Sequence, residues 1–149
     1  MTTRNIDSVN AYYHFLHYQG DTFNFTFKYL DNDGNPISLS GATAEMSIRK
    51  SPTSPNLVCL LTDDYPNGAF GPSGDSSEFG YTGGVTSGTG GIRLENSGVT
   101  GSINIIINGD TTSKLPTTRT HYNLQITTSD GESRTILSGT FEIAKQTTR

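Results

Sequence analysis

The sequence lacks the features typical of disulfide-linked, zinc-binding, nucleic-acid-binding and membrane-spanning proteins. Its single cysteine, Cys59, excludes an intrachain disulfide and a cysteine-based zinc site, and we expect it to be a small buried hydrophobe. The ten Lys and Arg residues form no cluster and the net charge is −4. Because neutralising phosphates needs a basic stripe, no nucleic-acid partner is expected. No apolar run approaches the roughly 20 residues that span a bilayer, so no membrane segment is expected either.

Charge and apolar content are also low. Charged residues make up 16% of the chain and apolar residues 32%, whereas about 25% charge is typical of globular proteins. Polarity therefore comes from neutral hydroxyls, amides and glycine, and the core must be lean. The first ten residues, MTTRNIDSVN, contain no apolar stretch of the signal-peptide type, so we expect the chain to stay in the cytoplasm in which it is made.

Alternation of apolar and polar residues with period two dominates the chain. Such alternation predicts strands with one face on a core and the other in solvent. The runs lie at residues 23–29, 44–48, 92–94, 103–107, 122–126 and 137–143, with two further strands at 12–18 and 56–61, the first of them aromatic on both faces. No 3.6-residue apolar period persists over three turns, and we expect at most one helical turn at 110–115, with Asp110 as its cap.

Two clusters of turn residues separate these runs. Residues 31–36 (DNDGNP) and 129–132 (SDGE) tolerate positive φ, and each predicts a hairpin connection. The whole pattern predicts an all-β fold, an antiparallel Ig-like β-sandwich of about eight strands that forms a single domain over residues 1–149. Residues 1–18 would then form an N-terminal extension or an edge strand.

Residues 63–90 do not fit the sandwich pattern and predict one long inserted loop. The segment is rich in Gly, Ser, Pro and Thr and carries four aromatic residues. Compact domains rarely contain structureless loops beyond about 12–15 residues, and such loops are usually functional or disordered. The loop either contacts a neighbouring protein surface or folds back on its own sandwich.

The motifs that could carry chemistry are incomplete, so we expect no enzyme, no cofactor and no metal site. No G-x-S-x-G elbow or phosphate-binding glycine loop is present, and Asp63 and Asp64 are adjacent, hence splayed apart in an extended chain. His14 and His17 are three residues apart, which places them on opposite faces of a strand. The Asp31-x-Asp33 pair resembles the opening of a calcium loop, but the rest of that motif is missing, and a turn is the better interpretation.

A family resemblance lies in two blocks of the sequence. Residues 19–51 contain a G-D start, a strand, a D-x-D-G-x-P turn, an S-L-S-G step and a strand ending in I-R. Residues 102–149 contain an isoleucine strand, a T-T-x-x-L turn, an H-Y-N-L strand, a D-G hairpin and a closing L-S-G-T-F-E-I strand. This order resembles small β-sandwich virion proteins of tailed bacteriophages and is similar to the N-terminal sandwich of upper baseplate proteins.

The resemblance implies a non-enzymatic structural component of the tail, baseplate or neck. Such a protein is assembled in the host cytoplasm and located in the virion, with other virion proteins and copies of itself as partners in a large symmetric assembly. We expect the N-terminal segment and the long loop to make the contacts, because aromatic residues anchor interfaces at low rotamer cost. The candidate contact residues are Tyr12, Tyr13, Phe15, Tyr18, Tyr65, Phe70, Phe79 and Tyr81. Alternatively, half of them complete the core.

Two other functions stay open. A capsid cement or decoration protein would be present in hundreds of copies per particle, whereas a tail component would be present in tens, in multiples of three or six. A carbohydrate-binding β-sandwich module would bind sugars through loop aromatics, and replacing Tyr65 or Tyr81 would abolish that binding. Analogy of fold alone supports the carbohydrate-binding alternative.

Overall fold

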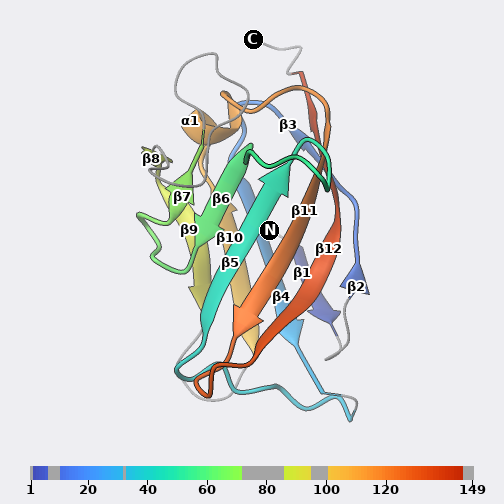
Figure 1. The fold of residues 1–149 in the computed structure, drawn as a ribbon, viewed down its shortest axis with the longest axis vertical. Helices are drawn as coiled ribbons and strands as arrows, with labels where there is room; N and C mark the ends of the chain where they lie inside the picture. Colours follow the sequence, from blue (N-terminus) through green and yellow to red (C-terminus); the bar gives the residue numbers. More distant parts are fainter. Residues whose placement is uncertain (1, 7–10, 32, 72–85, 95–100, 146–149) are drawn as a thin grey trace.

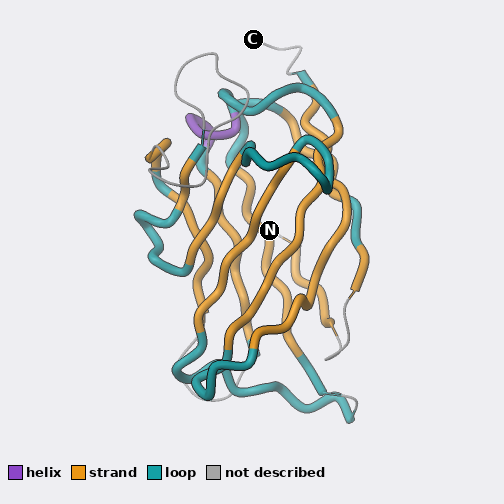
Figure 2. The backbone as a smooth tube through the Cα atoms, viewed as in Figure 1, coloured by secondary structure: helices purple, strands orange, loops and turns teal. Residues whose placement is uncertain are grey.

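The computed structural model describes residues 2–6, 11–31, 33–71, 86–94 and 101–145. Two β-sheets pack face to face in this part of the chain (Figures 1 and 2). The first sheet has the order β1 (Thr2–Ile6), β4 (Phe23–Tyr29), β10 (Ser102–Ile107) and β9 (Gly90–Leu94). The predicted all-β sandwich is confirmed.

The second sheet is wider and carries the N-terminal segment at one end. Its order is β2 (Ala11–Tyr12), β12 (Ser133–Ala144), β11 (Arg119–Thr127), β5 (Thr43–Arg49), β6 (Cys59–Thr62), β7 (Ala69–Phe70) and β8 (Thr86–Gly88). A further strand, β3 (Phe15–Tyr18), also pairs with β12. Strands β2 and β3 therefore lie at the opposite end of the sheet from β7 and β8 (Figure 1).

The alternating runs place their apolar side chains between the two sheets. Phe23, Phe25, Phe27 and Tyr29 of β4 are buried, as are the isoleucines at 103, 105 and 107 of β10. On the second sheet, Tyr122 and the other apolar residues of β11 face them. Removing one such side chain from water is worth about 1.5–3 kcal/mol, so the period-two pattern is itself the main source of the layered fold.

The N-terminal segment changes sheets and pairs in parallel. Strand β1 pairs with β4 in the first sheet, and β2 and β3 then pair with β12 in the second. All three pairings are parallel, whereas every other pairing between described strands is antiparallel. The expectation of an antiparallel sandwich therefore holds for the body of the domain and not for its N-terminal edge.

The two predicted hairpin turns differ in outcome. Residues 129–132 join β11 to β12 as expected, with the Thr128 amide donating to the Glu132 carbonyl oxygen over 2.9 Å and Gly131 at φ 88°. At residues 31–36 the chain also turns, and the Asp31 carboxylate accepts from the Asp33 and Asn35 amides, each over 2.9 Å. Leu30 and Pro36 form an antiparallel bridge across this turn, and the Ile37 amide donates to the Tyr29 carbonyl oxygen over 2.9 Å, so the chain does reverse as predicted. The turn does not join two strands of one sheet, however, because β4 and β5 belong to different sheets and the chain crosses over after it.

The helical turn lies close to its predicted place but has a different cap. Helix α1 spans Gly109–Thr112, and the Asn108 side chain accepts from the Thr111 amide over 3.0 Å. The predicted cap, Asp110, lies inside the first turn instead. Among the described residues, no helix has the length and apolar character needed to cross a membrane.

Part of the expected long loop belongs to the second sheet. Within residues 63–90, β7 pairs with β6 and β8 pairs with β7, and Ala69 is fully buried. Residues 72–85 lie outside the described part of the chain, so the structure describes the ends of the insertion and not its middle. These ends extend the sandwich at the edge opposite the N-terminal segment.

Candidate contact surface

The side chains of residues 12–18 point alternately to the core and to solvent, as their pairing with β12 requires. Tyr12 is in register with Ser138, Phe15 with Phe141, and Tyr18 with Ala144. Because successive side chains in a strand point to opposite faces, one set turns inward and the other outward. The inward set is Tyr13, Phe15 and His17, and the outward set is Tyr12, His14, Leu16 and Tyr18.

The outward set carries the exposed large hydrophobic side chains of the described residues. Tyr12 is 73% exposed, Leu16 57% and Tyr18 49%. We call these three side chains the edge patch. Single exposed apolar residues are ordinary on a protein surface, but these three side chains lie on the same face of the edge formed by β2 and β3, which makes that face the candidate contact surface. Sequence reasoning identified Tyr12 and Tyr18 and missed Leu16, although continuing the alternation from Tyr12 would have found it.

The other two predicted residues of this segment face the core. Phe15 is 5% exposed and its ring lies 4.8 Å from that of Phe25, edge to face. Tyr13 is half-buried and stacks on Phe25 with ring centroids 5.8 Å apart. Within the N-terminal segment, the predicted aromatic residues are thus divided evenly between the core and the outward surface.

The predicted residues of the long loop lie far from the edge patch. Phe70 is half-buried in β7, at the opposite end of the second sheet. Tyr65 is half-buried, and the Arg93 guanidinium lies 5.1 Å from its ring centroid, so a cation–π contact covers one ring face. Phe79 and Tyr81 lie outside the described residues. The described residues therefore form two separate groups, one at each end of the sheet.

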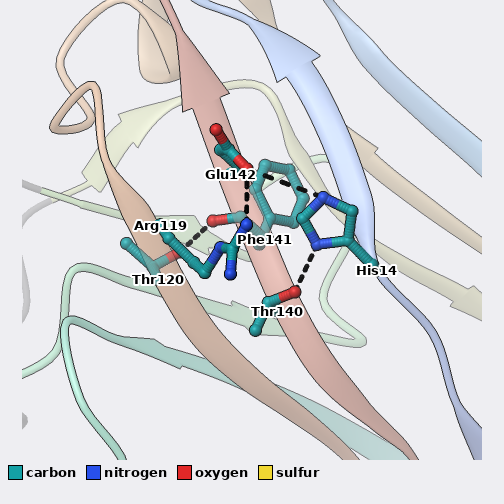
Figure 3. A network of polar contacts seen from close by, with 6 residues as sticks. All are labelled: His14, Arg119, Thr120, Thr140, Phe141 and Glu142. Atoms are coloured by element: carbon teal, nitrogen blue, oxygen red, sulfur yellow. Dashed lines mark hydrogen bonds and ion pairs between the residues drawn. The ribbon is translucent and has the colours of Figure 1, made fainter.

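A polar network fastens the N-terminal segment to β12 (Figure 3). The imidazole of His14 hydrogen-bonds through Nδ1 to the Thr140 hydroxyl, and its Nε2 lies 3.6 Å from a carboxylate oxygen of Glu142. The Arg119 guanidinium lies 3.4 Å from the same oxygen. The network thus connects the segment before β3 to β12 and, through Arg119, to β11.

A hydroxyl, an imidazole and a carboxylate are also the groups of an acyl-transfer triad. In such a triad the hydroxyl is accessible to substrate and the carboxylate bonds directly to the imidazole. Here Thr140 is only 7% exposed, and the 3.6 Å separation of Glu142 from His14 exceeds a hydrogen bond. This geometry suits a clamp that holds the edge in place and does not suit an activated nucleophile.

The second histidine of the segment lies on the other face, as the spacing predicts. Nε2 of His17 donates to the Asp21 carbonyl oxygen over 2.7 Å, and its ring packs edge to face on Phe23 with centroids 5.3 Å apart. His14 and His17 therefore do not converge on one point. Over the described part of the chain, no three His, Cys, Asp or Glu side chains gather closely enough to hold a metal ion.

An open groove runs beside the edge, between the two sheets. It has a volume of about 280 Å³ and is lined by residues 13–17 of the N-terminal segment and by residues 22–25 at the start of β4. Strand β1 pairs with β4 from Phe25 onward and leaves Phe23 and Asn24 without a β1 partner. The outer side of β3 is therefore bordered by a groove and not by another described strand.

Comparisons with known proteins give no family assignment. No model of a known protein family matches the sequence, and no curated protein matches it. Among solved structures, the N-terminal domain of phage TP901-1 ORF48 is similar over 97% of this chain and 100% of that chain, with a TM-score of 0.44 and 9% identity. A family 123 glycoside hydrolase from Clostridium perfringens is similar over 91% of this chain and 23% of that chain, with a TM-score of 0.31 and 13% identity.

Proposed function

We propose that this chain is a non-enzymatic structural component of a tailed-phage particle, part of its tail, baseplate or neck. In this proposal it contacts neighbouring subunits through its N-terminal segment and its long loop. The observation that carries the proposal is the edge patch, in which Tyr12 of β2 and Leu16 and Tyr18 of β3 face solvent on the same side of the sheet edge. The resemblance of residues 19–51 and 102–149 to phage virion sandwiches supports the kind of assembly proposed.

The energetics favour a role inside a large assembly over tight binding by one isolated pair. Fully burying an exposed Leu or aromatic side chain is worth about 1.5–3 kcal/mol, and the three patch residues are 49–73% exposed, so covering them contributes roughly 3–5 kcal/mol. Association opposes this with about 4–15 kcal/mol of lost translational and rotational freedom. A single patch therefore gives weak binding, whereas many linked contacts in a particle reinforce one another.

Replacing the edge patch tests the proposal. We suggest a phage whose copy of this gene carries Tyr12→Thr, Leu16→Thr and Tyr18→Thr, because threonine keeps the strand propensity while removing most of the apolar area. Quantitative mass spectrometry of purified particles should show a large loss of the chain. A matched variant, Asn123→Thr with Gln125→Thr, changes exposed positions on β11 of the same sheet and should leave incorporation unchanged.

Two results would contradict the proposal. One is the absence of the unchanged chain from purified particles. The other is normal incorporation of the patch variant, provided that its circular dichroism confirms a folded chain. Copy number then separates the related alternatives: tens of copies in multiples of three or six support the tail, and hundreds support decoration of the capsid.

A further inference from the structure

A shallow pocket lies on the outward face of the second sheet, away from the core. It has a volume of about 260 Å³, and its lining includes Ser47 and Arg49 of β5, His121 of β11, Ser138 of β12 and Tyr12 of β2. These four strands are neighbours in the sheet (Figure 1). Pockets that hold drug-sized ligands measure roughly 300–1,000 Å³, so this pocket suits a smaller molecule.

The strand register brings three of these side chains together. Arg49 is directly opposite His121 across the β5–β11 pair, which places their Cβ atoms about 5 Å apart. Ser47 is two residues before Arg49 on the same face of β5 and lies diagonal to His121, at about 7–8 Å. A guanidinium, an imidazole and a hydroxyl therefore converge on an area that one small chemical group can cover.

All three side chains can donate hydrogen bonds. The Arg49 guanidinium donates to the Ser54 carbonyl oxygen over 3.0 Å, which holds the end of this long side chain in place. Toward the residues that the structure describes, this is the one hydrogen bond of the guanidinium, and the side chains of Ser47 and His121 form none. Most of the donor capacity at the pocket is therefore available to a ligand.

The charge of the pocket is positive. None of the described residues that line it is Asp or Glu, and the guanidinium of Arg49 is always charged. Two carboxylates lie elsewhere on the same sheet. Glu142 is 3.4 Å from Arg119 and 3.6 Å from His14, so cationic and polar groups already surround it, and Glu45 lines a separate pocket. The local chemistry therefore favours an anion that accepts several hydrogen bonds.

We propose that this pocket binds a phosphate group, as the free ion or as part of a small phosphorylated molecule. A planar guanidinium pairs with an oxyanion through two parallel hydrogen bonds. The imidazole of His121 and the hydroxyl of Ser47 then serve the remaining oxygens. Phosphate has enough acceptor oxygens for donors from three side chains, whereas a carboxylate has two oxygens.

This site goes beyond the proposed function and does not depend on it. Arg49 and His121 lie on β5 and β11, and β12 separates them from the edge strands β2 and β3. Of the edge patch, Tyr12 borders the pocket. Phosphate binding by the purified chain and incorporation of the chain into particles are therefore separate measurements, and either can fail while the other succeeds.

Titration of the isotope-labelled chain with sodium phosphate, followed by amide chemical shifts, tests the proposal. At constant pH and ionic strength, we expect saturable shifts at Ser47, Arg49 and His121. The net charge of −4 provides no general attraction for anions, so such shifts would report the pocket itself. Sodium acetate should bind several-fold more weakly, because its carboxylate leaves part of the donor set unpaired.

A second titration distinguishes the two sources of the phosphate group. Glucose 6-phosphate that binds more tightly than inorganic phosphate, while glucose does not bind, supports a phosphorylated small molecule as the ligand. Inorganic phosphate that binds at least as tightly as glucose 6-phosphate supports the free ion.

Substitution of the guanidinium tests its role. Arg49→Gln removes the charge and keeps a polar side chain, and it should weaken phosphate binding by about tenfold or more. Arg134→Gln is the matched control, because it makes the same change in net charge at a residue that pairs with Glu132 over 2.8 Å and lines a different pocket. It should leave the affinity unchanged. Arg49→Lys keeps the charge and loses the planar fork, so its affinity should lie between the two.

Several results would overturn the site. These are the absence of saturable shifts with phosphate, binding of acetate as tight as that of phosphate, and equal weakening by Arg49→Gln and Arg134→Gln. Amide signals of β10 that stay in place verify that each variant is folded. If Arg49→Gln does not fold, Arg49→Lys carries the test, and an affinity equal to that of the unchanged chain would overturn the proposed pairing.

Discussion

The hydroxyl of Tyr122 donates a 2.8 Å hydrogen bond to the backbone carbonyl oxygen of Tyr13. Tyr122 belongs to the central strand β11, whereas Tyr13 lies in the N-terminal segment on the far side of β12. Burial raises the pKa of the Tyr122 hydroxyl above its ordinary range, so it remains a neutral donor. This bond holds the edge that carries the proposed contacts to the centre of the sheet.

Removing that hydroxyl should weaken the fold by a modest and measurable amount. Tyr122→Phe keeps the ring in the core and deletes the donor, and we expect the free energy of unfolding to fall by about 1 kcal/mol in urea denaturation. The matched change Tyr12→Phe alters a residue that is 73% exposed, and it should have an effect within about 0.5 kcal/mol. Equal losses in the two variants would show that the bond contributes nothing specific.

Gly139 makes room for the same contact. A Cβ at this position would overlap the Tyr13 carbonyl oxygen, and the φ of 153° is one that other residues rarely adopt. Gly139 is also in register with Tyr122, so the missing side chain leaves space for the Tyr122 ring to reach Tyr13. The glycine in the L-S-G-T-F-E-I motif therefore has a structural role in seating the N-terminal segment on β12.

We predict that Gly139→Ala displaces the N-terminal segment while the rest of the sandwich persists. The overlap and the backbone strain together should cost about 2–3 kcal/mol. Hydrogen exchange should show faster exchange at residues 11–18 and unchanged protection in β5. Gly131→Ala is the matched control, because its φ is 88° but no atom lies within 4 Å of the added Cβ. It should cost about 1 kcal/mol and leave residues 11–18 protected.

The layered fold could be predicted because period-two alternation identifies the buried face of a strand without knowledge of its partner. Residues 23–29 and 122–126 alternate without interruption, and both place their apolar side chains in the core. Which strands pair with one another depends on residues far apart in the sequence, and local alternation gives no information about it. The crossover after residue 36 and the parallel pairing of the N-terminal strands were therefore missed.

The contact surface was partly predictable for a related reason. Both faces of residues 12–18 carry aromatic side chains, so composition does not reveal which face is buried. Pairing with β12 determines which face is buried, because it turns Phe15 inward and Leu16 outward. Aromatic character alone therefore selected Phe15, a core residue, and overlooked Leu16.

Cys59 offers a test of the core through its chemistry. The thiol is buried in β6, and loss of hydration raises its pKa from 9.0 to about 12. Because the thiolate is the reactive form, the folded protein at pH 8 should react with a thiol reagent far more slowly than the chain unfolded in guanidinium chloride. Rapid reaction of the folded protein at pH 8 would contradict the buried position.

The same shift predicts how stability changes with pH. Below about pH 9 the thiol is neutral in the folded and unfolded chains, so it adds no pH dependence. Between about pH 9 and 12 the unfolded chain loses the thiol proton and the folded chain keeps it, so the free energy of unfolding falls as the pH rises. Cys59→Ala removes this component, and the difference between the two denaturation series isolates it from the contribution of Tyr122.

Asn108 and Asp110 provide the sharpest comparison between the sequence and the structure. Both residue types are good helix caps, and local sequence does not decide between them because the start of the helix depends on where β10 ends. The strand ends at Ile107, so Asn108 is the first residue able to leave the sheet. Its Oδ1 accepts from both the amide and the hydroxyl of Thr111, each over 3.0 Å.

We therefore predict that Asn108→Ala lowers the free energy of unfolding by about 1 kcal/mol in urea denaturation. Asp110→Ala changes an exposed side chain in the first turn and should have an effect within about 0.5 kcal/mol. Asn108→Asp keeps the acceptor oxygen and should restore most of the loss. If Asp110→Ala were the more damaging change, the helix would start two residues later than the structure places it. Such a result would contradict the two hydrogen bonds that the buried Thr111 donates to the Asn108 side chain.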